Sequence, residues 1–236
     1  MKAEETFVAP KPWNSKICVA NWKMNKTRQS TREFLTELGP IPSDVTVVIC
    51  PPFTSLGEPW PAGVTLCAQN FYPEERGAFT GEISLEMLKE FNVSTVLVGH
   101  SERRNIFNET EELINRKVRA ALEAGFNVIL CVEGNFEQQL ASALEGIVLP
   151  KEGRLAIAYE PDWAIGTGQS ATRDQIESVH AKIKYIVNVP VLYGGSVNES
   201  NAKDILASAY VAGVLVGGAS LDPKKFARIL QIASSL

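Results

Sequence analysis

Four side chains suited to moving protons or binding an anion stand at or just after the ends of short apolar segments. They are Asn21 and Lys23 after Ile17–Ala20, His100 after Val93–Val98, and Glu160 after Leu155–Tyr159. A carboxylate that ends a buried strand is partly desolvated, which suits a general base. A neutral imidazole donates a hydrogen bond, and a lysine stabilises developing negative charge. Without metal-ligand spacing in the sequence, these groups favour proton transfer next to a carbonyl group.

Small residues after later apolar segments favour a phosphate site. They are Gly194, Gly195 and Ser196, then Gly217 and Gly218, together with Gly166, Thr167 and Gly168. Small residues let backbone N–H groups approach an anion, and loops after the last two strands of a parallel barrel often hold phosphate. One glycine pair would be explained by a tight turn. Two pairs at successive segment ends favour a phosphate site.

Ordinary structural roles compete with each of these assignments. Most glutamates and lysines are solvated surface charges, and a lone histidine is most often a hydrogen-bonded structural residue. The position of Glu160 at a strand end, before a proline, favours catalysis. His100 falls at the same end of the predicted sheet, whereas His180 lies in a predicted helix and takes the structural role. Asn21 and Lys23 stay ambiguous when taken alone.

The elements that must position these residues are apolar segments alternating with helical ones. The strand candidates are Ile17–Ala20, Val45–Cys50, Val64–Ala68, Val93–Val98, Asn127–Val132, Leu155–Tyr159, Val189–Tyr193 and Val211–Val216. Helical spacing of apolar residues occurs at Ile114, Val118 and Leu122, at Phe136, Leu140, Leu144 and Val148, at Ile176, Val179, Ile183 and Ile186, and at Phe226, Leu230 and Ala233. Thr172 with Gln175 predicts a capping box, Asp222 with Pro223 predicts the start of the last helix, and Gly125 predicts a helix end.

Strands that are apolar on both faces and alternate with helices indicate a parallel sheet. Eight such units favour closure, so we predict the α/β class, with a single-domain (β/α)8 barrel over residues 1–236 and an N-terminal extension at 1–15. The alternative is a doubly wound open sheet. That fold more often has five or six strands and a glycine-rich turn after the first, which Ala20–Asn25 lacks.

Composition narrows the partners further. The hydrophobic share is 45% and the charged share 21%, which excludes disorder, and the net charge of −4 argues against nucleic acid and anionic membranes. Cys18, Cys50, Cys67 and Cys131 each lie in an apolar segment, which predicts reduced core thiols. The N-terminus does not resemble a signal peptide, and no apolar stretch reaches membrane-spanning length, so we expect a cytoplasmic protein. We also expect no metal and no cofactor, because the sequence has no metal-ligand spacing.

Six motifs give the chain a resemblance to the triosephosphate isomerase family. They are ANWKMN (Ala20–Asn25), GAFTGE (Gly77–Glu82), VGHSERR (Val98–Arg104), AYEPDWAIGTG (Ala158–Gly168), YGGSV (Tyr193–Val197) and LVGGASL (Leu215–Leu221). They follow the family's order and cover nearly the whole chain. The resemblance implies interconversion of dihydroxyacetone phosphate and D-glyceraldehyde 3-phosphate through an enediolate, in glycolysis and gluconeogenesis.

The resemblance also implies residue roles. Glu160 is then the base and His100 the neutral electrophile, while Lys23 supplies positive charge and Asn21 positions the substrate. The phosphate is expected at Gly166, Ser196, Gly217 and Gly218. A lid, Pro161–Gly168, is expected to close over it and exclude water, held by Tyr193 and Ser196. A protruding segment, Asn70–Thr80, implies a homodimer.

Three features depart from the family pattern. Asp162 stands where an apolar lid residue is usual, and Glu133 precedes Gly134 where the family has the reverse order. We expect these two changes to alter the kinetics of the lid and leave the chemistry intact. The third is that Asn135–Arg154 is shorter than usual while the N-terminal extension is longer.

Two other function classes compete with an isomerase. A phosphosugar epimerase or an indole-forming synthase on the same scaffold would share the phosphate site, but the pairing of VGHSERR with AYEP argues against both. A barrel that only binds phosphate would not need Glu160, His100 and Lys23 together.

Overall fold

The computed structural model describes residue 13 and residues 15–151, 153–161 and 170–236. Its eight strands are β1 (Lys16–Asn21), β2 (Val45–Cys50), β3 (Val64–Ala68), β4 (Thr95–Val98), β5 (Asn127–Val132), β6 (Leu155–Tyr159), β7 (Val191–Tyr193) and β8 (Gly213–Val216). All neighbouring strands pair in parallel, and β8 pairs with β1, so the sheet is a closed barrel. The (β/α)8 prediction is confirmed and the open sheet is excluded.

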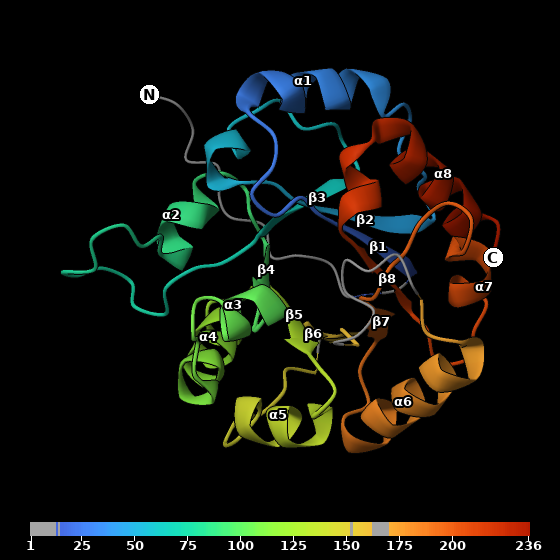
Figure 1. Cartoon of the computed structure of the whole chain (residues 1–236). Coiled ribbons are helices and arrows are strands. Elements are labelled where there is room, and N and C mark those ends of the chain that lie inside the picture. The colour runs from blue at the N-terminus through green and yellow to red at the C-terminus, as the bar shows by residue number, and fades with distance from the viewer. Residues whose placement is uncertain (1–12, 14, 152, 162–169) are drawn as a thin grey trace.

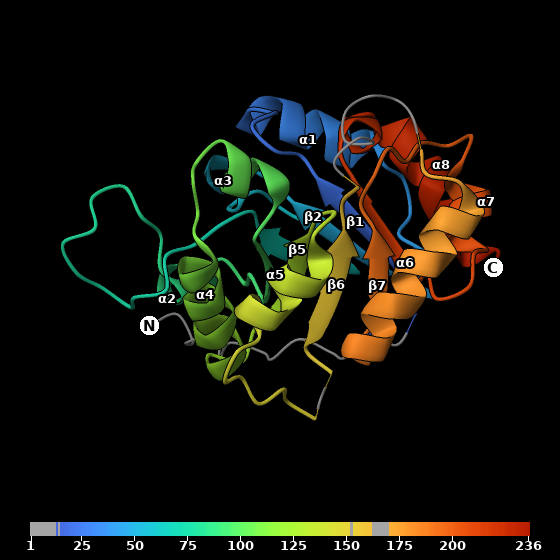
Figure 2. The ribbon, with the colours of Figure 1, turned by 60° about the horizontal axis from the view of Figure 1, so that its bottom comes forward.

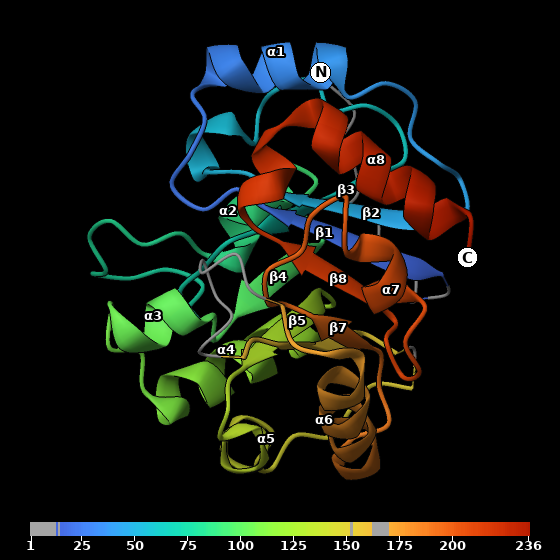
Figure 3. The ribbon, with the colours of Figure 1, turned by 45° about the vertical axis from the view of Figure 1, so that its right-hand side comes forward.

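Helices surround the strands on the outside of the barrel, as Figure 1 shows. The α-helices are α1 (Arg28–Glu37), α2 (Leu85–Lys89), α3 (Ser101–Asn105), α4 (Glu111–Glu123), α5 (Phe136–Ala143), α6 (Arg173–Ile186), α7 (Ala202–Leu206) and α8 (Pro223–Ser234), with short 3-10 helices η1 (Phe53–Ser55) and η2 (Gly218–Leu221). Figure 3 shows α8 lying across β1 and β2, which it contacts.

The start and stop signals in the sequence act as predicted at three helices. Thr172 and Gln175 form the reciprocal capping box of α6. Asp222 caps α8 and Pro223 is its first residue. Gly125 follows the end of α4 with φ of +84°, in the left-handed region that glycine tolerates.

The predicted extension of the fifth helix to Val148 is wrong. Helix α5 ends at Ala143, and Val148 is 93% exposed. Gly146 takes a left-handed conformation with φ of +64°, which a continuing α-helix does not allow. Three predicted strands also start later than expected, at Thr95, Val191 and Gly213, because the preceding apolar residues lie in loops.

The core has two parts, one inside the barrel and one between the barrel and its helices. The inner part is built from Ile17, Val19, Val48, Cys50, Cys67, Leu97, Ile129, Cys131, Ala158, Leu192 and Leu215. The outer part packs the other strand face against the helices. Apolar side chains on both strand faces are therefore buried, which is why the sequence shows continuous apolar segments. All four cysteines are buried free thiols, as the sequence predicts.

None of the helices in the described ranges has the length and apolar character needed to cross a membrane.

Candidate active site

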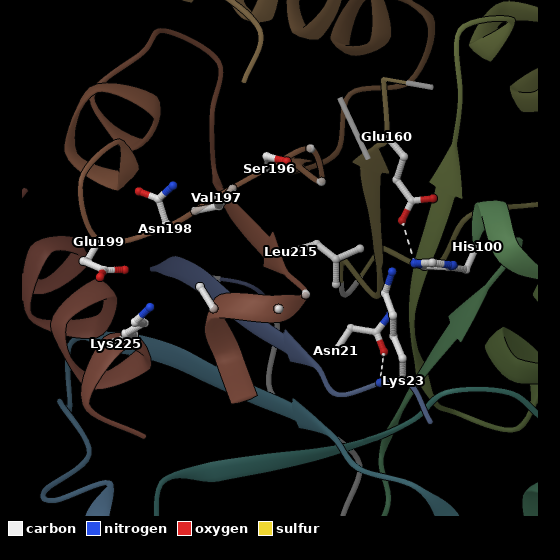
Figure 4. Close-up of a pocket in the computed structure, with 15 residues that line it drawn as sticks. Asn21, Lys23, His100, Glu160, Ser196, Val197, Asn198, Glu199, Leu215 and Lys225 are labelled. Atoms are coloured by element: carbon white, nitrogen blue, oxygen red, sulfur yellow. Dashed lines mark hydrogen bonds and ion pairs between the residues drawn. The ribbon is translucent and has the colours of Figure 1, made fainter. Parts of the chain in front are cut away.

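A cavity of about 360 Å³ opens at the carboxyl ends of the strands. Its lining includes all the described residues predicted for the site: Asn21, Lys23, His100, Glu160, Ser196, Gly217 and Gly218. Figure 4 shows Glu160 and His100 at one end of this cavity and the loop after β7 at the other. The remaining predicted residue, Gly166, lies outside the described residues.

Glu160 and His100 are in direct contact at the inner end of the cavity. Glu160 comes immediately after β6, and its N–H donates to the carbonyl oxygen of Val132, which continues the strand ladder by one residue. Its side chain is 2% exposed, and Oε1 lies 3.1 Å from Nε2 of His100. The other oxygen, Oε2, accepts the N–H of Ser101 at 2.9 Å. The carboxylate is therefore dry and held from two sides.

The backbone decides which nitrogen of His100 carries the proton. His100 is the N-terminal cap of α3, and its Nδ1 accepts the N–H of Glu102 at 3.2 Å. An Nδ1 atom that accepts a hydrogen bond holds no proton, so in the neutral ring the proton sits on Nε2. Nε2 then donates toward Glu160. In this tautomer the histidine presents a hydrogen-bond donor to the cavity. The role of a neutral electrophile stays a prediction.

Lys23 occupies a strained backbone position. Its φ of +52° lies in the left-handed region, which costs a non-glycine residue about 1 to 2 kcal/mol. Two hydrogen bonds hold it there: its N–H donates to Oδ1 of Asn21 at 3.1 Å, and its carbonyl oxygen accepts from Nε2 of Gln69 at 2.9 Å. Gln69 also donates to the carbonyl oxygen of Cys50 at 2.8 Å. The strain is thus sustained by a network that aims Lys23 into the cavity.

The ammonium group of Lys23 is paired with Glu102, at 2.7 Å from its Oε1. Both side chains are about one-third exposed, so this ion pair is weak and leaves the lysine available to an anionic substrate. Glu102 thereby contacts both Lys23 through its side chain and His100 through its N–H.

The glycine pairs at the two strand ends have different roles. A Cβ atom at Gly195 would lie 2.3 Å from the Tyr193 hydroxyl, and one at Gly194 would lie 3.0 Å from Cγ of Glu160. This first pair therefore serves close packing. A Cβ atom at Gly218 would meet open space, and Gly217 is fixed because its carbonyl oxygen accepts the hydroxyl of Ser220 at 2.7 Å. The second pair leaves backbone open to the cavity.

The segment that follows the undescribed residues is tied to β7. The Tyr193 hydroxyl accepts the N–H of Ala171 at 2.9 Å, and burial raises the pKa of Tyr193 above its usual value. The hydrogen bond from Ala171 acts in the opposite direction on this pKa, and burial is the larger effect. Tyr193 was predicted to hold the lid, of which only Pro161 is described, and residues 162–169, Asp162 among them, lie outside the described part.

Glu133 forms hydrogen bonds with residues of α3 and α5. Its Oε1 accepts from Nδ2 of Asn105 at 2.8 Å, and its N–H donates to Oε1 of Gln139 at 2.8 Å. These contacts link the end of β5 to α3 and α5. The predicted coupling of Glu133 to Asp162 stays a prediction.

The thiol of Cys131 lies near the base. Burial, and after it the negative charge of Glu160, holds the pKa of this thiol well above its ordinary value. The thiol is therefore neutral at physiological pH and does not compete with Glu160 for protons. Among the described residues, no group of three or more His, Cys, Asp and Glu side chains could hold a metal ion.

Sequence reasoning missed Gln69 and the role of Glu102. Gln69 directly follows β3, so the rule that found Glu160 after β6 also selects it. Its amide side chain carries no charge, and its function is to hold a backbone carbonyl, which residue type alone does not reveal.

Comparison with known proteins agrees with this geometry. The family model described as triosephosphate isomerase matches residues 16–233. A triosephosphate isomerase of Aquifex aeolicus is 44% identical, with 91% of this chain and 98% of that protein covered. Those of Idiomarina loihiensis and of a Synechococcus strain are 41% and 43% identical, covering 93% and 91% of this chain and 98% and 95% of theirs. The chain therefore belongs to the triosephosphate isomerase family.

Proposed function

We propose that Glu160 is the proton-transferring base and His100 the neutral electrophile with which this isomerase interconverts dihydroxyacetone phosphate and D-glyceraldehyde 3-phosphate. The observation that carries the assignment is the contact between Glu160 Oε1 and His100 Nε2 at the inner end of the cavity. A base and a hydrogen-bond donor on the same side can act on a carbon and on the carbonyl oxygen beside it.

The reaction is a proton transfer between neighbouring carbons. Glu160 removes a proton from the carbon next to the carbonyl group, and the electron pair moves to the carbonyl oxygen, giving an enediolate. His100 Nε2–H stabilises that oxygen, and the ammonium group of Lys23 lowers the energy of the negative charge. Glu160 then returns its proton to the former carbonyl carbon, while a proton moves between the two oxygens. No net charge or atom is lost.

Substrate binding must move the Glu160 carboxylate. Its two oxygens are occupied by His100 Nε2 and by the N–H of Ser101, so a substrate can reach the base only after these contacts loosen. Gly194 accommodates the side chain in its present position, because a Cβ atom there would press against Cγ of Glu160.

The phosphate group is proposed to bind at Ser196, Gly217 and Gly218, with Gly166 completing the site. The open backbone at Gly218 supports this placement, as does the fixed peptide at Gly217. Asn21 supports the substrate indirectly, since its Oδ1 holds the backbone of Lys23.

The Glu160→Gln variant tests the assignment of the base. Glutamine keeps the shape but cannot take a proton, so we expect kcat to fall by about 10³-fold or more. Binding of the analogue 2-phosphoglycolate should remain measurable by calorimetry. Glu123→Gln, at an exposed position on α4 outside the cavity, is the matched control. Turnover would be followed with a dehydrogenase that consumes dihydroxyacetone phosphate, with and without EDTA. Unchanged turnover in Glu160→Gln would overturn the assignment.

The cytoplasm is the proposed location, supported by four buried free thiols that are stable in a reducing compartment.

The proposed assembly is a homodimer. Segment 70–80 projects away from the barrel in Figures 1 and 2. Within it, the rings of Tyr72 and Phe79 pack against each other, with 4.5 Å between their centroids and a tilt of 40° between their planes. Beside the active site, a second cavity is lined in part by the exposed side chains Met24, Phe53 and Phe107.

An arginine in place of Thr80, at the end of the projecting segment, tests the dimer. Thr80→Arg places a charge where we expect the segment to enter the partner. The mass of this variant in solution, measured by light scattering, should therefore fall from that of two chains to that of one. Thr36→Arg, on the exposed face of α1, should keep the two-chain mass. A two-chain mass for both variants would contradict this arrangement.

A further inference from the structure

The cavity of the active site extends to charged side chains that the mechanism above does not use. Asn198, Glu199 and Lys225 line it beyond the phosphate-binding residues. In Figure 4, Glu199 and Lys225 lie at the end of the cavity opposite Glu160 and His100. Ser196 lies between these two ends in Figure 4, so a substrate phosphate held there would lie between the reacting groups and this charged end.

The backbone holds both charged residues in place. Lys225 belongs to the first turn of α8, and its N–H donates to Oδ1 of Asp222 at 3.1 Å. Glu199 lies in the loop after β7, where Oδ1 of Asn198 accepts the N–H of Ser200 at 2.9 Å. In the same loop, Nδ2 of Asn201 donates to the carbonyl oxygen of Ser196 at 3.0 Å. This loop joins Glu199 to the phosphate-binding Ser196 in one ordered unit.

The charge of the whole chain makes a local cation important. The net charge is −4, so a doubly charged triose phosphate meets an unfavourable long-range field as it approaches. Lys23, which forms a weak ion pair with Glu102, lies at the other end of the cavity, beside Asn21 and His100. Lys225 lies at the opposite end of the cavity and is exposed to solvent, so its charge is accessible to an approaching phosphate.

We propose that Lys225 attracts the substrate phosphate into the cavity and that Glu199 opposes it, so that this charge pair sets the rate of substrate capture. The proposal rests on the function proposed above. It concerns the encounter step only, because neither side chain reaches the end of the cavity where Glu160 and His100 lie.

Removing the charge of Lys225 and removing the charge of Glu199 should change kcat/KM in opposite directions. At low ionic strength, Lys225→Gln should lower kcat/KM about threefold and Glu199→Gln should raise it by about the same factor, as one unit charge near a dianion in water implies. The charge reversal Lys225→Glu should lower kcat/KM about ninefold. The double variant Lys225→Gln with Glu199→Gln should return close to the unsubstituted protein.

Salt dependence separates capture from chemistry. All these differences should shrink toward zero as sodium chloride approaches 1 M, where the screening length is about 3 Å. The value of kcat should stay constant throughout, because the chemical step does not involve these charges.

Lys224→Gln is the matched control. Lys224 is the preceding residue of the same helix turn, is exposed, and does not line the cavity, yet its substitution changes the net charge equally. We expect its kcat/KM to stay near that of the unsubstituted protein. If Lys225→Gln and Lys224→Gln behave alike at every salt concentration, or if Lys225→Gln lowers kcat instead, the proposal is wrong. Absence of isomerase activity in the unsubstituted protein would instead overturn the proposed function.

Discussion

A backbone N–H fixes the chemistry of His100. The N–H of Glu102 donates to Nδ1, which leaves the proton of the neutral ring on Nε2 and directs it at Glu160. The first turn of α3 thus selects the nitrogen that donates in the neutral ring, because an Nδ1 atom that accepts a hydrogen bond carries no proton. The sequence does not show which ring nitrogen of His100 donates, and its position as the N-terminal cap of α3 decides this.

At the residue scale, replacing each of the two histidines distinguishes a residue that affects kcat from one that affects only stability. His100→Gln replaces the imidazole that we propose as the donor to the carbonyl oxygen with an amide donor of different position and reach, and we expect kcat to fall by about 10² to 10⁴-fold. His180→Gln, on α6 and outside the cavity, should leave kcat unchanged while lowering the melting temperature. Steady-state kinetics and thermal melts of both variants check this. Equal kcat values for the two variants would refute the role given to His100.

At the scale of elements, α6 is held to the barrel partly by a buried neutral histidine. The His180 ring packs at right angles to Tyr159 of β6, and its Nδ1 lies 3.4 Å from the carbonyl oxygen of Tyr210. Burial lowers the pKa of His180 from 6.5 to about 4. The packing of α6 on β6 and β7 therefore depends on keeping this ring uncharged.

The His180 shift predicts how stability depends on pH. As pH falls below 6.5, histidine takes up a proton in the unfolded chain but not in the folded one, where its pKa is about 4. The free energy of unfolding should therefore fall between pH 6.5 and pH 4 and level off below, by at most about 3 kcal/mol from this residue. Urea unfolding of the original protein and of His180→Gln at one protein concentration measures the difference. Parallel pH profiles would show that His180 contributes nothing.

At the scale of the whole molecule, closure of the barrel depends on the absence of a side chain at Gly213. This residue begins β8 and pairs with Ile17 of β1 and Leu192 of β7. A Cβ atom here would lie 2.0 Å from the carbonyl oxygen of Ile17. The three nearest atoms are all backbone atoms of Ile17, so no side chain can turn away to make room.

Gly213→Ala should therefore destabilise the protein by about 3 kcal/mol or more, or prevent folding, because β1 and β8 must separate. Gly57→Ala is the control, since its added Cβ atom would make an ordinary contact of 3.5 Å with Phe91. Denaturant unfolding of both variants checks the prediction. A Gly213→Ala protein as stable as Gly57→Ala would mean that the barrel closes with more freedom than the pairing of β1 and β8 implies.

The sequence by itself determined the elements and the end of the barrel at which the chemistry lies. Apolar segments buried on both faces predict strands, and the polar residue after each one predicts where Asn21, His100 and Glu160 gather. These signals are local, since they depend on burial and on capping within a few residues. These signals failed at the end of α5, where the helical spacing of apolar residues continues to Val148. The helix ends at Ala143, before Gly146 takes a left-handed conformation, and Val148 is exposed.

Only the tertiary structure decided how the gathered groups act on one another. The proton position on His100, the strained backbone of Lys23 and the support from Gln69 depend on hydrogen bonds between residues, some of them far apart in sequence. The different roles of the two glycine pairs also appeared only there, because a missing Cβ matters through what would occupy its place. Sequence spacing carries no information on such distances, so residue types predicted the chemistry while the folded backbone set its geometry.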